Sequence, residues 1–104
     1  MKVAVRYFGK IRELFNIKRE EYEVPEGISI ADLIVNVIPE AHKEVAEVWK
    51  GTIFRTFKGE ILKDKNGMPI LQEYLILVNG RSCRLEHKLN NGDEVAILPP
   101  FGGG

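Results

Sequence analysis

The sequence predicts an α+β fold, in which a main helix packs across one face of a sheet. Strands rich in apolar side chains lie near both ends of the chain, and a helix with one apolar stripe lies between them. Turn sequences with glycine, proline or asparagine separate these segments. With 104 residues, 44% of them hydrophobic, the chain is long enough for one core. We therefore expect a single domain over residues 1–104.

The N-terminal segment predicts two strands that form a hairpin. The first covers Lys2–Phe8, where apolar and polar side chains alternate. The stretch "KIRELFN" follows, and its helical spacing indicates a turn or a short helix. In "REEYEVPEG", Tyr22 and Val24 fall on one face of a second strand, and the turn at residues 25–27 closes that strand.

The main helix is predicted to begin after Ser29. The Ser29 hydroxyl is a good N-cap, and Asp32 lies three positions further on, as in a capping box. The apolar stripe consists of Ile30, Leu33, Ile34, Val37 and Ile38. Because proline removes a backbone donor, we expect Pro39 to interrupt the helix, with a break or a second helix rather than one straight rod. The stretch "EAHKEVAEVWK" then resumes the helical spacing, and Gly51 is expected to terminate it.

The second half of the chain predicts further strands. The segment Thr52–Gln72 is expected to hold one or two short strands around Lys58-Gly59 and a turn at Asn66-Gly67. The stretch "EYLILVNG" predicts a strand over Tyr74–Val78, apolar enough to be buried on both faces. A hairpin turn at Asn79-Gly80 follows it.

The last strand is predicted over Glu94–Leu98, after a turn at Asn91-Gly92. Its apolar side chains are typical of a central strand. Pro99 and Pro100 cannot donate hydrogen bonds to a sheet, so the chain is expected to leave the sheet there. Residues 99–104 are therefore predicted to form an extended, flexible C-terminal tail.

Composition excludes several classes of function. Fifteen basic residues balance 15 acidic ones, so the chain lacks the basic footprint of a protein that binds nucleic acid or a membrane surface. A single cysteine, Cys83, excludes an internal disulfide and a zinc site made of cysteines. Charges occur every few residues at the N-terminus, and no stretch is long and apolar enough to span a membrane. We expect a cytoplasmic protein without a metal site.

The ending "PPFGGG" is the most informative motif. Three glycines cannot help to build a core. This end is therefore either a linker without a function or a tail whose terminal carboxylate is the reacting group. A glycine tail is slim enough to enter a narrow channel, and its backbone groups stay free for a partner. Phe101 is hard to place in a core from such a tail, which favours contact with a partner.

Four segments together carry a resemblance to a known family: "MKVAVRYFGKIRE", "PEGISIADLI", "LVNG" and "LNNGDEVAILPPFGGG". They resemble the small subunits of molybdopterin synthase in the MoaD/ThiS sulfur-carrier family, which implies a ubiquitin-like β-grasp fold with a mixed sheet. The segment Thr52–Glu73 is longer than compact members need. The chain also ends in three glycines, where the family typically shows two.

The resemblance implies a carrier chemistry at Gly104. A ubiquitin-activating-like adenylyltransferase would use ATP to adenylate the terminal carboxylate, and a sulfur donor would convert it to a thiocarboxylate. The large synthase subunit would then transfer the sulfur to a pterin precursor in molybdenum or tungsten cofactor biosynthesis. The chain itself would be a non-catalytic subunit that binds no cofactor stably. Partner contacts are expected from Gly102, Gly103, Phe101, Pro100 and Phe8, of which Phe8 could equally be a core residue.

Other functions remain open from the sequence. The activated glycine could be joined to a target lysine, as in a ubiquitin-like modifier, or the sulfur could go to thiamin precursors or to transfer RNA. The chain could also be a binding module with an idle tail. Cys83 and His87 suggest a thiol catalyst, but a structural role is favoured for both. Trp49 is expected in a core stripe with its valine neighbours, and His42 on an exposed helical surface without a function.

Overall fold

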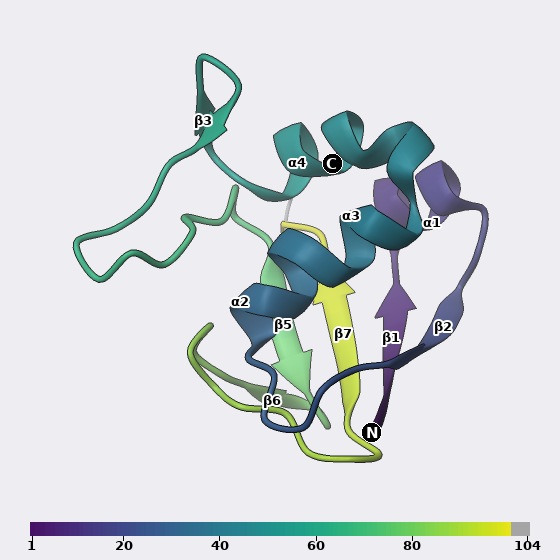
Figure 1. Cartoon of the computed structure of the whole chain (residues 1–104). Coiled ribbons are helices and arrows are strands. Elements are labelled where there is room, and N and C mark those ends of the chain that lie inside the picture. Colours follow the sequence, from purple (N-terminus) through teal and green to yellow (C-terminus); the bar gives the residue numbers. More distant parts are fainter. Residues whose placement is uncertain (101–104) are drawn as a thin grey trace.

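The computed structural model describes residues 1–100, and its centre is a mixed sheet of five strands in the order β2-β1-β7-β5-β6. Strands β1 and β7 are parallel, and the other neighbours are antiparallel. The strands are β1 (Lys2–Tyr7), β2 (Arg19–Glu23), β5 (Leu75–Val78), β6 (Arg81–Ser82) and β7 (Glu94–Leu98). The helices cover one face of this sheet, as Figure 1 shows. The predicted α+β fold is confirmed.

The helical layer is built from short segments joined end to end. They are α1 (Gly9–Phe15), α2 (Ile30–Asp32), the π-helical η1 (Leu33–Val37), α3 (Ile38–Ala41), the 3₁₀-helical η2 (Lys43–Val45) and α4 (Ala46–Ile53). A separate two-stranded ribbon, β3 (Thr56–Phe57) and β4 (Glu60–Ile61), projects beyond them (Figure 1). Among the described residues, no helix has the length and apolar character needed to span a membrane.

The start of the main helix is as predicted. The Ser29 hydroxyl accepts a hydrogen bond from the Asp32 backbone N–H over 3.0 Å, which satisfies one of the free donors at a helix N-terminus. The predicted stripe faces the core: Ile30, Leu33, Ile34 and Ile38 have no exposed surface. The structure therefore confirms both the predicted start of this helix and its predicted buried face.

The predicted break and second helix are present, but the break does not fall at Pro39. The chain stays helical from α2 through α3, and Pro39 is the second residue of α3. The π-helical stretch comes directly before it, and the Ile38 N–H bonds to the Leu33 carbonyl five residues earlier. The break falls at His42 instead, whose φ of −128° and ψ of 54° are not helical.

Gly51 does not end the following helix either, because α4 continues to Ile53. A glycine inside a helix costs about 0.5 to 1 kcal/mol relative to alanine. Burial of Ile53 and of Phe54, the C-cap, contributes about 1.5 to 3 kcal/mol each and outweighs this cost. Trp49 is fully buried, and its indole N–H donates to the Ile34 carbonyl, which confirms it as a core residue. Val48 is 54% exposed and is not part of that core.

The strands in the second half match the predictions, with one correction. Turns lie at Lys58-Gly59 and Asn79-Gly80, where all four residues have positive φ, and β7 is the central strand. However, β5 is not buried on both faces. Ile76 and Val78 lie in the core, whereas Leu75 is 39% exposed and Leu77 is half-buried. The helices cover only one face of the sheet, so the opposite side chains of β5 face outward.

Candidate functional site

The base of the C-terminal tail is held firmly by the sheet. The last strand, β7, pairs with β1 through Tyr7 and Ile97 and with β5 through Leu75 and Leu98, so both of its edges are occupied. Regular strand structure ends at Leu98, and Pro99 follows outside the ladder. The sheet therefore fixes the point at which the tail begins, and the chain leaves the sheet at Pro99, as predicted.

A groove of about 560 Å³ lies beside this point. It is lined by Gly9, Lys10, Gly51, Thr52, Gln72, Glu73, Tyr74, Pro99 and Pro100. Burial raises the pKa of the Tyr74 hydroxyl, so this group stays a hydrogen-bond donor at neutral pH. The groove thus brings together the starts of α1 and of the tail, the end of α4 and the segment before β5.

An apolar patch covers the open face of the sheet next to the tail. We define the open-face patch as Phe8, Leu75, Leu77, Ala96 and Leu98. Leu75 pairs with Leu98 and Leu77 with Ala96, so these four side chains lie on neighbouring positions of β5 and β7. All four are at least partly exposed. Contiguous apolar surface that is open to solvent makes this face a candidate for contact with another macromolecule.

Phe8 joins this patch from the end of β1. It is half-buried and lies two positions after Arg6 in extended backbone, so both side chains point to the open face. The Arg6 guanidinium lies 5.3 Å from the centre of the Phe8 ring. The predicted alternatives for Phe8 were core and partner contact, and its place on the open face favours partner contact.

The remaining predicted tail residues, Phe101, Gly102, Gly103 and Gly104, lie outside the described residues, so their roles stay predictions. Pro100 lines the groove described above. Cys83 is half-buried, and its thiol donates to the Arg81 carbonyl over 3.6 Å, whereas His87 is exposed. Within residues 1–100, no group of three or more potential metal ligands lies together.

A polar cluster at the edge of the core was missed by the sequence analysis. One oxygen of Glu20, Oε1, accepts hydrogen bonds from the Tyr7 hydroxyl (2.9 Å), the Tyr22 hydroxyl (2.7 Å) and His42 Nε2 (2.6 Å). The His42 ring also stacks on Phe15, with ring centres 3.8 Å apart. We expected His42 on an exposed helical surface, and this prediction was wrong. His42 is partly buried and links the break after α3 to β2 through Glu20 and to α1 through Phe15.

The cluster shifts the ionisation of its members. Burial alone would raise the pKa of Glu20, but hydrogen bonds from His42, Tyr22 and Tyr7 outweigh it and lower this pKa below its usual value. Burial raises the pKa of both tyrosines far above their ordinary value, so they stay protonated donors. Glu20 is thus the anionic acceptor that holds three donors from separate elements.

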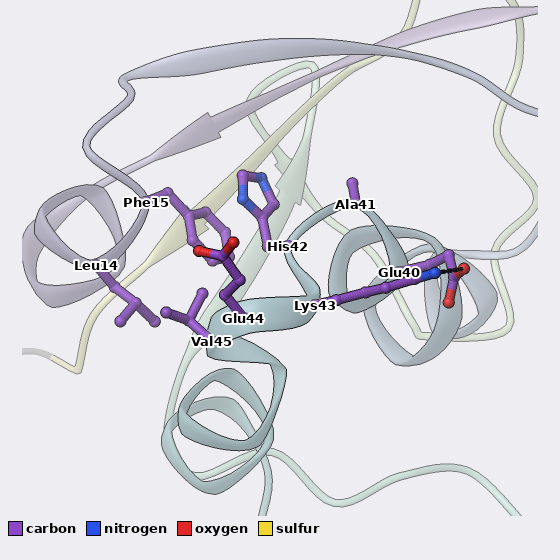
Figure 2. A pocket seen from close by; sticks show the side chains of 8 residues that line it. All are labelled: Leu14, Phe15, Glu40, Ala41, His42, Lys43, Glu44 and Val45. Carbon is purple, nitrogen blue, oxygen red and sulfur yellow. Dashed lines mark ion pairs between the residues drawn. The ribbon is translucent and has the colours of Figure 1, made fainter.

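The cluster adjoins an open cavity of about 630 Å³, shown in Figure 2. Its lining consists of Leu14, Phe15, Glu40, Ala41, His42, Lys43, Glu44 and Val45. Lys43 is paired with Glu40 at 3.0 Å, and the His42 nitrogen Nε2 is occupied by Glu20. The tail groove shares none of these residues, so we assign this region a structural role.

We expect Glu20→Gln to destabilise the fold by about 1 to 3 kcal/mol at pH 7, because a neutral amide replaces a carboxylate that accepts three hydrogen bonds. A carboxyl with a lowered pKa contributes stability above its unfolded pKa of about 4.3, and this contribution is lost as pH falls through the folded pKa. The difference between variant and wild type should therefore shrink below pH ~4. Urea unfolding across pH measures it.

The neighbouring Glu21→Gln provides the control for this experiment. Glu21 is exposed on the other side of β2, where it forms an ion pair of 3.8 Å with Arg19. Its loss should change the free energy of unfolding by less than about 1 kcal/mol. Equal effects of the two substitutions would contradict a special role for Glu20.

The amino-acid sequence of this chain matches a known protein family. The sequence pattern of the ThiS family matches residues 5–104 of this chain. The chain belongs to the ThiS family. The matched range contains the residues of the open-face patch and of the groove and also the terminal glycines, and the match confirms the resemblance that the four sequence segments indicated.

Relatives of this ThiS-family chain are similar over nearly their whole length. A molybdopterin synthase sulfur carrier subunit from Chlamydomonas reinhardtii is 31% identical over 104 residues, which cover 100% of both chains. The solved structure of a putative molybdopterin converting factor, subunit 1, from Pyrococcus furiosus is 32% identical. It matches with a TM-score of 0.68 over 97% of this chain and 99% of that one.

A third relative is the small archaeal modifier protein 1 from Methanosarcina acetivorans. Its solution structure is 27% identical, with a TM-score of 0.69 over 99% of this chain and 96% of that one. TM-scores of 0.68 and 0.69 over nearly the full length show that this chain shares the fold of these neighbours. The fold of this ThiS-family chain is therefore the ubiquitin-like β-grasp, as predicted.

Proposed function

We propose that this chain is the sulfur carrier subunit of a molybdopterin synthase and acts in molybdenum or tungsten cofactor biosynthesis. The observation that carries the proposal is full-length similarity to a relative named as such a subunit, at 31% identity over 100% of both chains. The structure contributes a central strand that is fixed on both sides and leads directly into the glycine-ended tail. This arrangement suits a chain that presents its own terminus to other proteins.

The proposed partner is the large subunit of the synthase. The open-face patch supports such a partner, because it lies beside the start of the tail and exposes four apolar side chains together with Phe8. A partner bound to the patch would have the tail within its reach. A few residues near the centre of an interface commonly supply most of its binding free energy, while the contacts around them exclude water.

The proposed chemistry takes place at the carboxylate of Gly104. Charge and resonance make a carboxylate a poor electrophile, so an adenylyltransferase with bound ATP would first convert it to an acyl-adenylate. A sulfur donor at the hydrosulfide level would then attack the carbonyl carbon, and AMP would leave as the C–S bond forms. The resulting thiocarboxylate is the sulfur nucleophile. ATP would be bound by the enzyme, and this chain would hold no cofactor of its own.

The residues before the glycines would reduce the cost of ordering the tail in a partner. Fixing one backbone residue costs about 1 to 2 kcal/mol. Pro99 and Pro100 have little freedom to lose, because the proline ring already fixes φ. Phe101 would anchor the tail by contact with the partner, and Gly102 and Gly103 would pass through its narrow channel. A single cysteine, without an internal disulfide, agrees with the proposed cytoplasmic location.

Intact-protein mass spectrometry tests the proposed function. The chain is incubated with ATP, an adenylyltransferase of this type and a sulfur donor. We expect the mass gain of one oxygen replaced by sulfur, localised to the peptide that ends at Gly104. Omission of ATP should prevent it. An unchanged terminus with an enzyme that modifies a known carrier would refute the proposal.

A second candidate function is that of a protein modifier, joined through Gly104 to a lysine of a target. It is favoured by the similarity to the small archaeal modifier protein 1 of Methanosarcina acetivorans, at 27% identity and a TM-score of 0.69. Peptides carrying the tail in an isopeptide bond, found in digests of host proteins, would support it. Both functions use the same activated glycine, so one chain could serve both.

A further inference from the structure

Gly9 differs from the other glycines of this fold in what surrounds it. Its φ is +58°, and a Cβ atom built on it would lie 3.3 Å from Cγ and 3.7 Å from Cβ of Pro99. The other described glycines with positive φ would place a Cβ atom in open space; they are Gly27, Gly59, Gly67, Gly80 and Gly92. Among the glycines that the structure describes, Gly9 alone makes room for another part of the chain.

The neighbour of Gly9 is the first residue of the tail. Pro99 comes directly after Leu98, the last residue of the central strand. Its ring fixes φ near −65°, so the position of the ring decides the direction of the peptide that follows. The backbone of α1 at Gly9 lies against this ring and lines the groove with it.

We propose that Gly9 is a positioning residue for the C-terminal tail. This inference rests on the proposed function, because it assigns Gly9 the task of setting the direction in which the reacting terminus leaves the sheet. A methyl group at position 9 would sit closer to the proline ring than most Cβ contacts allow, so the ring must move by a few tenths of an ångström. Because the proline is rigid, that shift changes the direction of the chain beyond it.

The test measures kcat/KM of the adenylyltransferase for four variants of the full chain. We expect Gly9→Ala to lower kcat/KM about threefold, because a changed direction at Pro99 makes the productive approach of the terminus rarer, while the freely rotating glycines absorb part of the change. Gly27→Ala is the matched control, because φ is +76° there and nothing lies within 4 Å. It carries the same backbone strain and should leave kcat/KM unchanged.

Pro99→Ala completes the test. This substitution removes Cγ, the atom at 3.3 Å, and leaves only the contact at 3.7 Å. The double variant with Gly9→Ala and Pro99→Ala should therefore recover most of the activity that Gly9→Ala loses, relative to Pro99→Ala alone. Additive losses, or a Gly9→Ala variant as active as Gly27→Ala, would overturn the proposal.

Nuclear magnetic resonance separates this inference from the proposed function. Nuclear Overhauser contacts between the Gly9 Hα protons and the Pro99 ring should be present in wild type, and Gly9→Ala should change the Cα–Hα residual dipolar couplings of Pro99 and Pro100. Gly27→Ala should leave those couplings as they are. Unchanged couplings in Gly9→Ala would refute the role of Gly9 even in a chain that carries no sulfur.

Discussion

Deletion of Gly103 and Gly104 is expected to abolish thiocarboxylate formation and sulfur transfer while leaving the fold intact. The deletion removes the proposed reacting carboxylate and the slim segment that would carry it into a partner. The core is formed by residues between Val3 and Ile97, so the free energy of unfolding should change by less than about 0.5 kcal/mol. Mass spectrometry of the terminus and urea unfolding measure the two effects.

The truncated protein should still bind the large synthase subunit. The open-face patch is intact in it, and we expect its Kd to stay within about tenfold of the wild-type value, equivalent to a loss of about 1.4 kcal/mol. Retained binding without sulfur transfer would show that binding depends on the open-face patch and that sulfur transfer depends on the terminal glycines. Full sulfur transfer by the truncated protein would contradict the assignment of the reacting group.

The second large effect is expected from Leu75→Glu on the open face. Leu75 is 39% exposed and lies beside Leu98, so a glutamate fits the free protein but would be buried without a partner charge in the complex. We expect the Kd for the large subunit to rise about a hundredfold, which corresponds to about 2.7 kcal/mol. Isothermal titration calorimetry measures it.

Val48→Glu is the matched control, because Val48 is 54% exposed on α4 in the helical layer. It introduces the same charge and a similar change of surface on the opposite face of the sheet. Its Kd should stay within a few fold of the wild-type value. An equal loss in both variants would assign the effect to net charge, and no loss in Leu75→Glu would place the interface elsewhere.

Local chemistry explains why much of the fold could be predicted from the sequence. The Ser29 cap, the glycine turns and the strand Glu94–Leu98 depend on neighbouring residues, and all were predicted correctly. The errors at Pro39 and Gly51 have a common cause. Both residues have poor helix propensity, but the burial of their apolar neighbours and a π-helical turn outweighed it.

The candidate site was only partly predictable for a different reason. The tail motif is continuous in sequence, so it could be recognised. The open-face patch depends on the pairing of Leu75 with Leu98, and the apolar pattern of β5 does not say whether a helix covers its second face. The contact of Glu20 with His42 joins residues 22 positions apart and depends on the break after α3, which no local pattern predicts.

The parallel pairing of β1 and β7 also has a mechanical consequence. The two terminal strands lie side by side and run in the same direction, so a force between the chain ends loads their hydrogen bonds together in shear. β7 is bonded to β5 on its other edge as well. An unfoldase that pulls on the tail must therefore first break the hydrogen bonds in the middle of the sheet. The domain should resist a pulling force applied at its C-terminus far better than one applied at an edge strand such as β6.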